Sequence, residues 1–457
     1  MRKKRRIGLF FTIVLILSVL GFLAWFLMTI FEGGNPQIAI QPLPGYLTAD
    51  QKFSLVVTDT ERGLRTIKVT VKQGGREVPV FSQSFPFQGL LNRGGVHRHE
   101  TEFFLDPSRL NLAQGRVDLE IQVRDYSRRS GGDGNLGLLS HKMTVDTIPP
   151  AIRAVSRIHY VNLGGSGLIV YETSSDTDES GLYVKDLFFQ GYAASSEGRD
   201  GLCVCYFAIP YNMEAKPDIF LWAKDKAGNV SKAGFYCRIR KKRFRQDRIN
   251  ITDRFLKRIL PYFATVSFAA DSGNKEKFLK INRDLRQKNA ETFYDLRTRT
   301  SEERLWGDEN WARLRNAATM ARFADHRTYY YRGKKIDEQV HLGVDLASLA
   351  QSPVQATNSG RTIFTGDMGI YGLTVVIDHG QGISSGYSHL SKISVQTGQE
   401  ISRGEEIGFT GQTGLAGGDH LHFGIMVHGI PVNPIEWWDP HWVEDNILRK
   451  LRLLDGK

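Results

Sequence analysis

Cysteine is scarce in this sequence, with three residues in a chain of 457. Cys203 and Cys205 would share one face of a strand, so either could pair with Cys237, or all three could be buried free thiols. A metal site built from these three alone is disfavoured, because no fourth ligand stands at a recognisable spacing. Proline is also scarce beside glycine, 15 residues against 46, and this balance favours tight turns and a β-rich chain.

Long hydrophobic runs are absent except near the N-terminus, where an uncharged apolar stretch covers residues 7–31. About 20 apolar residues span a bilayer as a helix, so this run predicts an uncleaved, single-pass membrane anchor. A cleaved signal peptide is the alternative, but its apolar core would be only about 7–15 residues long. The basic residues 2–6 are expected to stay cytoplasmic, which sends the bulk of the chain to the periplasmic side of the inner (cytoplasmic) membrane.

Acidic residues are too few to balance the basic ones: 49 stand against 60, and the formal net charge is +11. A basic chain suits nucleic acid, anionic lipid or an anionic wall polymer. Because the anchor would carry the chain across the membrane, we expect no nucleic-acid partner. The densest basic run, residues 238–248, is either a solvated face or a contact for an anionic wall or lipid headgroups.

Alternating apolar and polar residues predict half-buried strands in the first half of the chain, for example at residues 66–71 and 117–123. Residues 177–182 echo residues 59–64, which suggests a repeated module. We therefore expect two β-sandwiches of about 100 residues each, joined near Asp146. They resemble the immunoglobulin-like spacer domains of bacterial surface proteins.

A basic, mainly helical segment is expected next. Thr252 is placed to cap a helix whose apolar face would hold Phe255, Leu256, Ile259 and Leu260. Pro261 and Gly273 are the expected breaks, and helical material is expected to continue to about residue 322.

The residues that carry chemistry lie in the last third, where eight of the 12 histidines follow residue 325. His420 and His422 would point the same way from a strand, with Leu421 on the opposite, core-facing side. His341 and Asp345 are spaced by four residues, so both can lie on one side of a bend or strand.

A catalytic zinc site keeps three protein ligands and an open position for a water molecule, which zinc activates as the nucleophile near neutral pH. Peptide hydrolysis also needs a general base and a general acid, and imidazole suits both tasks. Four histidines, with His389 as the fourth, and one aspartate therefore divide into three ligands and two proton-transfer residues.

The motifs HLGVDLASLAQSPVQAT, VVIDHGQG, YSHLS and HLHFGIMVHGIPVNPIEW resemble the lysostaphin/LytM-type zinc endopeptidases, which cut peptidoglycan cross-links. The resemblance implies that His341, Asp345 and His422 bind one Zn²⁺ per catalytic domain. It implies that His389 and His420 flank the site as general base and acid. It further implies a compact antiparallel β-sheet with a narrow groove and a peptidoglycan peptide as substrate.

The sequence departs from the family at three positions that bear on groove contacts. Asp419 stands where proline is common, Gly424 where glutamate is common, and Leu373 where asparagine is common. Asp419 is either a turn residue or a partner that orients His420. The remaining histidines of the last third, His379, His326, His428 and His441, are expected to be structural or at the surface.

We therefore expect a multidomain, mainly β protein whose function is that of a membrane-anchored zinc metalloendopeptidase of peptidoglycan. The alternative is a non-hydrolytic peptidoglycan-binding factor or an activator of another wall hydrolase. The helical segment before the catalytic domain could also cover the groove. The expected divisions are residues 1–34 (basic tip and transmembrane anchor), 35–146 and 147–240 (β-sandwiches), 241–324 (helical linker), 325–440 (zinc endopeptidase domain) and 441–457 (C-terminal tail).

Overall fold

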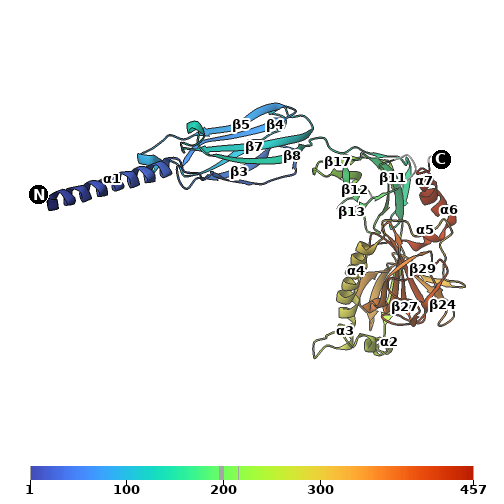
Figure 1. Cartoon of the computed structure of the whole chain (residues 1–457). Helices are drawn as coiled ribbons and strands as arrows, with labels where there is room; N and C mark the ends of the chain where they lie inside the picture. Colours follow the sequence, from blue (N-terminus) through green and yellow to red (C-terminus); the bar gives the residue numbers. More distant parts are fainter. Residues whose placement is uncertain (1, 195–199, 215, 456–457) are drawn as a thin grey trace. The chain divides into compact units, whose positions relative to one another are not determined.

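The computed structural model describes residues 2–194, 200–214 and 216–455. The chain divides into two compact units, one of residues 1–149 with 227–229 and the other of residues 150–226 with 230–457. Both units consist mainly of β-sheets, and a long apolar helix lies at the N-terminus (Figure 1). The mainly β fold class predicted from the sequence is confirmed.

Helix α1 (Arg2–Ile30) contains the apolar run. Within the described part of the chain it is the one helix that is long and apolar enough to cross a membrane. Its apolar side chains are exposed, with Phe10 at 63% and Leu15 at 65%. A signal sequence near the N-terminus can also contain a helix of this length and composition.

The first unit holds a three-stranded sheet, β1-β3-β6, and a five-stranded sheet, β2-β8-β7-β4-β5. Side chains of both sheets meet in one core, to which β7 contributes Val117, Leu119, Ile121 and Val123. Their polar neighbours point the other way, as the period of two predicts. The strands are β1 (Gln37–Gln41), β2 (Tyr46–Leu47), β3 (Gln51–Thr58), β4 (Leu64–Gln73), β5 (Arg76–Ser84), β6 (Arg98–Leu105), β7 (Gly115–Asp125) and β8 (Leu136–Val145).

The second unit begins with two four-stranded sheets, β14-β15-β11-β9 and β13-β12-β16-β17, and a parallel pair, β10-β18. All three cysteines are free thiols in the structure; Cys203 and Cys205 lie on β15 and Cys237 begins β18. The strands are β9 (Ile152–Ala154), β10 (His159–Asn162), β11 (Ser166–Thr173), β12 (Thr177–Val184), β13 (Leu187–Gln190), β14 (Tyr192–Ala193), β15 (Leu202–Ala208), β16 (Ile219–Asp225), β17 (Val230–Ala233) and β18 (Cys237–Arg240).

A helical segment follows strand β19 (Gln246–Ile251) and comprises α2 (Asp253–Ile259), α3 (Asn274–Lys280) and α4 (Arg286–Asp295). Thr252 caps α2 as predicted, because its hydroxyl oxygen accepts a hydrogen bond from the Phe255 amide at 3.1 Å. Pro261 lies in the 3₁₀ turn that ends α2, and Gly273 precedes α3. The predicted helix and both predicted breaks are therefore confirmed. The expected extension of helical structure to about residue 322 is wrong, because the last helical turn of this segment ends at Arg299 and residues 318–321 form a strand.

The C-terminal sheet has the order β20-β23-β31-β27-β26-β25-β29, with β32 beside β31, and its neighbouring strands are antiparallel. Its strands are β20 (Ala318–Ala321), β23 (Val344–Ala347), β25 (Gly360–Asp367), β26 (Leu373–Gly380), β27 (Ile383–Leu390), β29 (Glu400–Ile401), β31 (Leu421–Val427) and β32 (Ile430–Val432). Two small sheets flank it: β19 with β21 (His326–Tyr331) and β22 (Lys334–Val340), and β24 (Pro353–Gln355) with β30 (Glu406–Phe409) and β28 (Lys392–Ile393).

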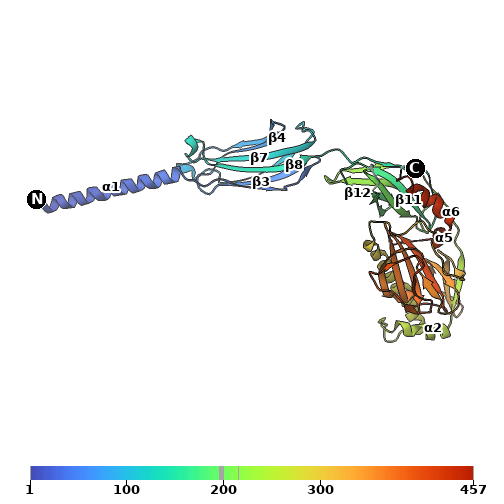
Figure 2. The same cartoon turned by 45° about the vertical axis from the view of Figure 1, so that its right-hand side comes forward.

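The second β-sandwich packs on this sheet through a common hydrophobic core. The short helices α5 (Pro434–Trp438), α6 (Pro440–Val443) and α7 (Arg449–Leu451) follow the sheet, and both views place α5 and α6 near β11 (Figures 1 and 2). Trp437 Nε1 donates to Ser166 Oγ at 3.1 Å, and Lys450 Nζ donates to the Leu168 carbonyl oxygen at 2.9 Å. The sandwich of residues 150–226 therefore supports the sheet that carries the candidate site.

Candidate metal centre

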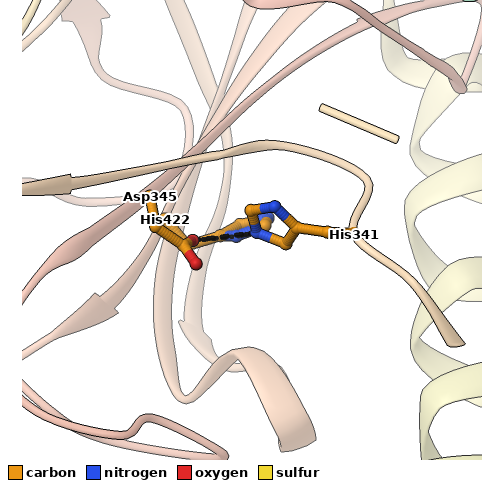
Figure 3. A group of neighbouring side chains, drawn as sticks. All are labelled: His341, Asp345 and His422. Atoms are coloured by element: carbon orange, nitrogen blue, oxygen red, sulfur yellow. Dashed lines mark hydrogen bonds and ion pairs between the residues drawn. The ribbon is translucent and has the colours of Figure 1, made fainter. Parts of the chain in front are cut away.

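Two paired strands bring the predicted metal-binding residues together. Strand β23 runs antiparallel to β31, with Asp345 directly opposite His422. Opposite residues of an antiparallel pair project to the same face, so the carboxylate and the imidazole meet there. His341 lies in the bend between β22 and β23 and reaches the same point from the loop (Figure 3).

Three potential ligand atoms converge at this point. Nε2 of His341 lies 2.9 Å from Oδ1 of Asp345 and 2.9 Å from Nδ1 of His422. Nδ1 of His422 lies 2.9 Å from the same oxygen of Asp345. In the described part of the chain this is the one group of three or more histidine, cysteine or acidic side chains placed to hold a metal ion.

The backbone fixes the orientation of the His341 imidazole and passes close to that of His422. Nδ1 of His341 donates to the carbonyl oxygen of Arg322 at 3.0 Å, so Nε2 of the neutral ring presents a lone pair to Asp345. A Cβ atom at Gly343 would lie 2.5 Å from Nε2 of His422. Glycine is therefore required here for the loop to pass so close to the ring.

His389 and His420 lie beside this group and face each other, with ring centroids 4.8 Å apart. Nδ1 of His389 donates to the Thr413 carbonyl oxygen, and Nδ1 of His420 donates to the Gly418 carbonyl oxygen, each at 2.8 Å. In the neutral form of each ring, Nε2 is then left as a proton acceptor. Nε2 of His420 lies 3.7 Å from Oδ1 of Asp345.

Burial and charge shift the pKa values of these groups. Burial, reinforced by the neighbouring imidazoles, lowers the pKa of His389 well below its usual value. Burial lowers the pKa of His422 to about 4. Burial alone would raise the pKa of Asp345, but the charge of His341 and hydrogen bonds with both histidines hold it well below the usual value. These shifts favour a neutral His422 and an ionised Asp345, the states in which these two side chains bind metals.

An apolar hollow of about 220 Å³ lies beside His422. Gly424 stands two residues after His422 on β31 and so shares its face. A Cβ atom at Gly424 would meet nothing closer than the Leu342 carbonyl oxygen at 3.7 Å, so the missing side chain leaves space. The other residues around the hollow include Phe293 and Tyr294 of α4, Gly386, Met426 and Pro431.

The helical segment reaches the loops around the site. Nη2 of Arg258 donates to the Gly417 carbonyl oxygen at 2.7 Å, and Oδ1 of Asn289 accepts from the Ile370 amide at 2.9 Å. Phe293 of α4 packs edge-on against Tyr371, whose ring centroid lies 5.3 Å from that of His422. Helix α4 therefore forms one wall beside the candidate centre.

Asp419 is a loop residue in the structure. Its carboxylate accepts from Thr410 Oγ1 at 2.7 Å and from the Gln351 amide at 3.2 Å. His379 is buried, with Nδ1 donating to the Ser359 carbonyl oxygen and Nε2 bonded to Ser385 Oγ. His428 is also buried, His326 is half-buried, and His441 is exposed, so none of these joins the candidate centre.

Sequence reasoning missed Arg327, which contacts the other oxygen of Asp345. Nη2 of Arg327 donates to Oδ2 of Asp345 at 2.9 Å. The two residues are 18 positions apart and lie in different sheets. No local spacing rule pairs them, so the contact becomes visible only in the folded chain.

Two imidazoles, one carboxylate and two flanking histidines on an antiparallel sheet define a candidate hydrolytic metal centre. Residues 339–434 match the family model described as peptidase family M23. The C-terminal part of this chain is therefore a peptidase family M23 domain, of the metallopeptidase class. The family resemblance and the enzyme class predicted from the sequence are confirmed.

Two curated relatives match this same part of the chain. One is the DD-carboxypeptidase/endopeptidase Mpg of Neisseria meningitidis, 41% identical over 97 residues, which are 21% of this chain and 22% of that protein. Another is the peptidoglycan DD-endopeptidase ShyA of Vibrio cholerae, 42% identical over 96 residues, again 21% and 22% of the two chains. Because these matches cover about a fifth of each protein, the activity, substrate and partners of the whole chain are proposals.

Solved structures also align with this chain. A putative peptidase M23 from Pseudomonas aeruginosa aligns over 64% of this chain and 95% of its own, at 21% identity and a TM-score of 0.36. The catalytic domain of lysostaphin from Staphylococcus simulans aligns over 27% and 94% of the two chains, at 27% identity and a TM-score of 0.24.

Proposed function

We propose that this protein is a membrane-anchored zinc metalloendopeptidase that hydrolyses peptide cross-links of bacterial peptidoglycan. The observation that carries the proposal is the convergence of His341 Nε2, Asp345 Oδ1 and His422 Nδ1 at mutual distances of 2.9 Å. Relatives described as DD-endopeptidases support the substrate class.

The three side chains fit zinc in type and in spacing. Imidazole nitrogen and carboxylate oxygen bind zinc at about 2.0–2.2 Å, so neighbouring ligands of a tetrahedral site lie roughly 3.3–3.5 Å apart. A separation of 2.9 Å needs only a small opening to reach that spacing. In the neutral form of His341 the ring proton lies on Nδ1, which donates to the Arg322 carbonyl oxygen, so Nε2 and Oδ1 of Asp345 then face each other as two acceptors. Such a contact favours a cation between the two atoms.

When bound, zinc would supply Lewis-acid activation of a water molecule near neutral pH. The residues of this chain would handle the protons of the reaction. His389 and His420 each offer Nε2 as an acceptor while Nδ1 is held by a backbone carbonyl. We assign one as general base and the other as general acid for the leaving amine. Both rings are largely buried, which limits competition from bulk water.

The hollow beside His422 would hold part of the peptide next to the scissile bond. Its position on the metal-binding face of β31 puts it next to any carbonyl that reaches the centre. The glycines at positions 386 and 424 let a peptide backbone approach this face closely.

Helix α1 is proposed to anchor the protein in the inner membrane, with the peptidase domain on the periplasmic side. Its exposed apolar surface and the basic residues 2–6 at its start support this orientation. Alkaline washing of isolated membranes tests the anchor. Retention of the intact chain in the membrane fraction is expected, whereas release of a shortened chain would indicate a cleaved signal sequence.

The test of the proposed activity is digestion of cross-linked peptidoglycan by the full-length chain purified in detergent. Cross-linked dimers are expected to decrease and monomers to increase, and a zinc chelator is expected to stop the change. A chain that binds peptidoglycan but cuts no peptide bond, with or without added zinc, would instead be the non-hydrolytic factor.

A further inference from the structure

A largely buried arginine occupies the far side of the Asp345 carboxylate. Nη2 of Arg327 donates to Oδ2 at 2.9 Å, while Oδ1 lies 2.9 Å from His341 and from His422. One oxygen thus faces the candidate metal position and the other faces the guanidinium. The two side chains are 22% and 13% exposed, so water has little access to the pair.

Arg327 comes from outside the part of the chain that matches the peptidase family. It lies on β21, which pairs with β19 and β22 in a separate three-stranded sheet. The family match begins at residue 339, after this strand. The flanking sheet therefore contributes a contact to the metal centre through this side chain.

Stability alone does not explain why a guanidinium is buried here. Removing two charges from water offsets much of their attraction, so a buried ion pair is weak evidence for stabilisation. Arg327 Nε is also buried without a hydrogen-bond partner among the described residues, and this unsatisfied donor lowers the free energy of unfolding further. The geometry of the pair points to a role at the carboxylate itself.

A carboxylate offers a metal ion one oxygen or two, and it rotates between these arrangements unless something holds it. We propose that Arg327 is a positioning residue that holds Oδ2 of Asp345, so that Oδ1 alone is presented to the ion. Ligand-supporting hydrogen bonds of this kind orient the atoms that bind the metal. This inference rests on the proposed function, because it presupposes a divalent ion between His341, Asp345 and His422.

Lysine is not an equivalent residue at this position. The guanidinium donates from a planar, rigid fork, whereas the lysine ammonium is a compact point charge on a flexible stem. Arg327→Lys therefore keeps the buried positive charge but no longer holds the Asp345 carboxylate in the same orientation. Arg327→Met removes both the charge and the donor.

The chain offers a closely matched control in Arg283. Its Nε donates to Oδ1 of Asp337 at 2.9 Å, and the Asp337 side chain is 7% exposed. Asp337 lies on β22, directly beside β21, and among the described residues it belongs to no group placed to hold a metal ion. Arg283 itself lies in the helical turn before α4 and is 52% exposed. Arg283→Met thus breaks an ion pair of the same length, to an aspartate of the same sheet, without touching Asp345.

The experiment measures the zinc dissociation constant of the full-length chain in detergent, by competition with a chromophoric chelator. Arg327→Met is expected to weaken zinc binding by about 10–100-fold, with Arg327→Lys in between and Arg283→Met unchanged. The visible spectrum of the cobalt(II)-loaded chain gives a second measurement. In both Arg327 variants, Asp345 is expected to turn and offer both oxygens to the cobalt ion. The higher coordination number then lowers the intensity of the visible absorption bands, whereas Arg283→Met keeps the wild-type spectrum.

Circular dichroism checks that each variant is folded, and Arg327→Lys keeps the test decisive if Arg327→Met does not fold. Folded Arg327 variants with wild-type affinity and a wild-type cobalt spectrum would overturn the positioning role while leaving the proposed function intact. Tighter zinc binding in Arg327→Met would also overturn it, because the arginine would then act against the ion. A wild-type chain that binds no zinc would remove both proposals together.

Discussion

Nε2 of His341 and Nδ1 of His422 lie 2.9 Å apart, although 81 residues separate them in the sequence. His341 is held from one side by the Arg322 carbonyl oxygen, and His422 lies on β31 opposite Asp345. The His341→Ala variant therefore loses one of three proposed ligands from a preformed group. We expect its purified form to contain no stoichiometric zinc, measured by atomic emission after dialysis. Wild-type zinc content in this variant would exclude His341 as a ligand.

His420→Ala and His389→Ala are expected to keep zinc and lose turnover, because their proposed task is proton transfer. Loss of a general acid or base typically lowers the rate by about 10²–10⁴-fold. Zinc content and kcat are measured on the same preparations. The control is His441→Ala, which removes an exposed histidine. Full activity in either active-site variant would contradict the proton-transfer role assigned to that residue.

Gly424→Leu tests whether the hollow beside His422 receives the substrate. The new side chain has room, since the nearest atom to a Cβ there is 3.7 Å away. We expect kcat/KM for a cross-linked peptide to fall at least tenfold while zinc affinity stays the same. Gly234→Leu is the matched control, because a Cβ there also meets nothing within 4 Å. An unchanged kcat/KM in Gly424→Leu would show that the peptide binds elsewhere.

The two β-sandwiches are expected to differ in their importance for folding. Residues 36–146 lie in the first compact unit, whereas the second sandwich shares a core with the catalytic sheet. Deleting residues 36–146 is expected to leave hydrolysis of a soluble peptide unchanged. Deleting residues 36–237 also removes Ser166 and Leu168, the partners of Trp437 and Lys450, and is expected to lower the thermal unfolding temperature sharply. Equal unfolding temperatures for both deletions would contradict this difference.

Lys450 makes the second unit sensitive to pH. Burial lowers the pKa of its ammonium from 10.5 to about 8. Because the pKa of Lys450 is lower in the folded chain than in the unfolded chain, the charged form of this lysine destabilises the folded state. The folded state therefore becomes more stable as the pH rises from about 8 to 10.5, and it loses this stability as the pH falls again. Denaturant titrations at pH 7.5 and pH 10 measure the unfolding free energies of wild type and Lys450→Met. Between these two pH values, the free energy of wild type relative to the variant should rise by about 2–3 kcal/mol. A difference that does not vary with pH would show that the pKa of Lys450 is not lowered in the folded chain.

Local patterns predicted those parts of the fold that depend on neighbouring residues. Alternation in residues 117–123 predicted β7, and the Thr252 cap predicted α2. The His420-Leu421-His422 alternation predicted that the His422 side chain would point away from the core-facing side of its strand. Strand β31 places His422 opposite Asp345. These signals are short in range, since they depend on strand periodicity, capping and spacing within a few residues.

The rest depends on contacts between distant strands, which no local pattern encodes. Arg327 is one of 60 basic residues, and nothing in its neighbourhood marks it as the partner of Asp345. The hollow beside His422 requires α4 to pack near β31, although the sequence does show Gly424 as a departure from the family pattern. The shared core of the second sandwich and the catalytic sheet likewise arises from pairs such as Ser166 and Trp437, 271 residues apart.

The most direct test of the metal centre is an anomalous difference map at the zinc edge from crystals of the zinc-loaded protein. The expected result is one strong peak within about 2.0–2.2 Å of His341 Nε2, Asp345 Oδ1 and His422 Nδ1. A peak bound by other residues, or no peak at these three atoms in fully zinc-loaded crystals, would contradict the proposed centre.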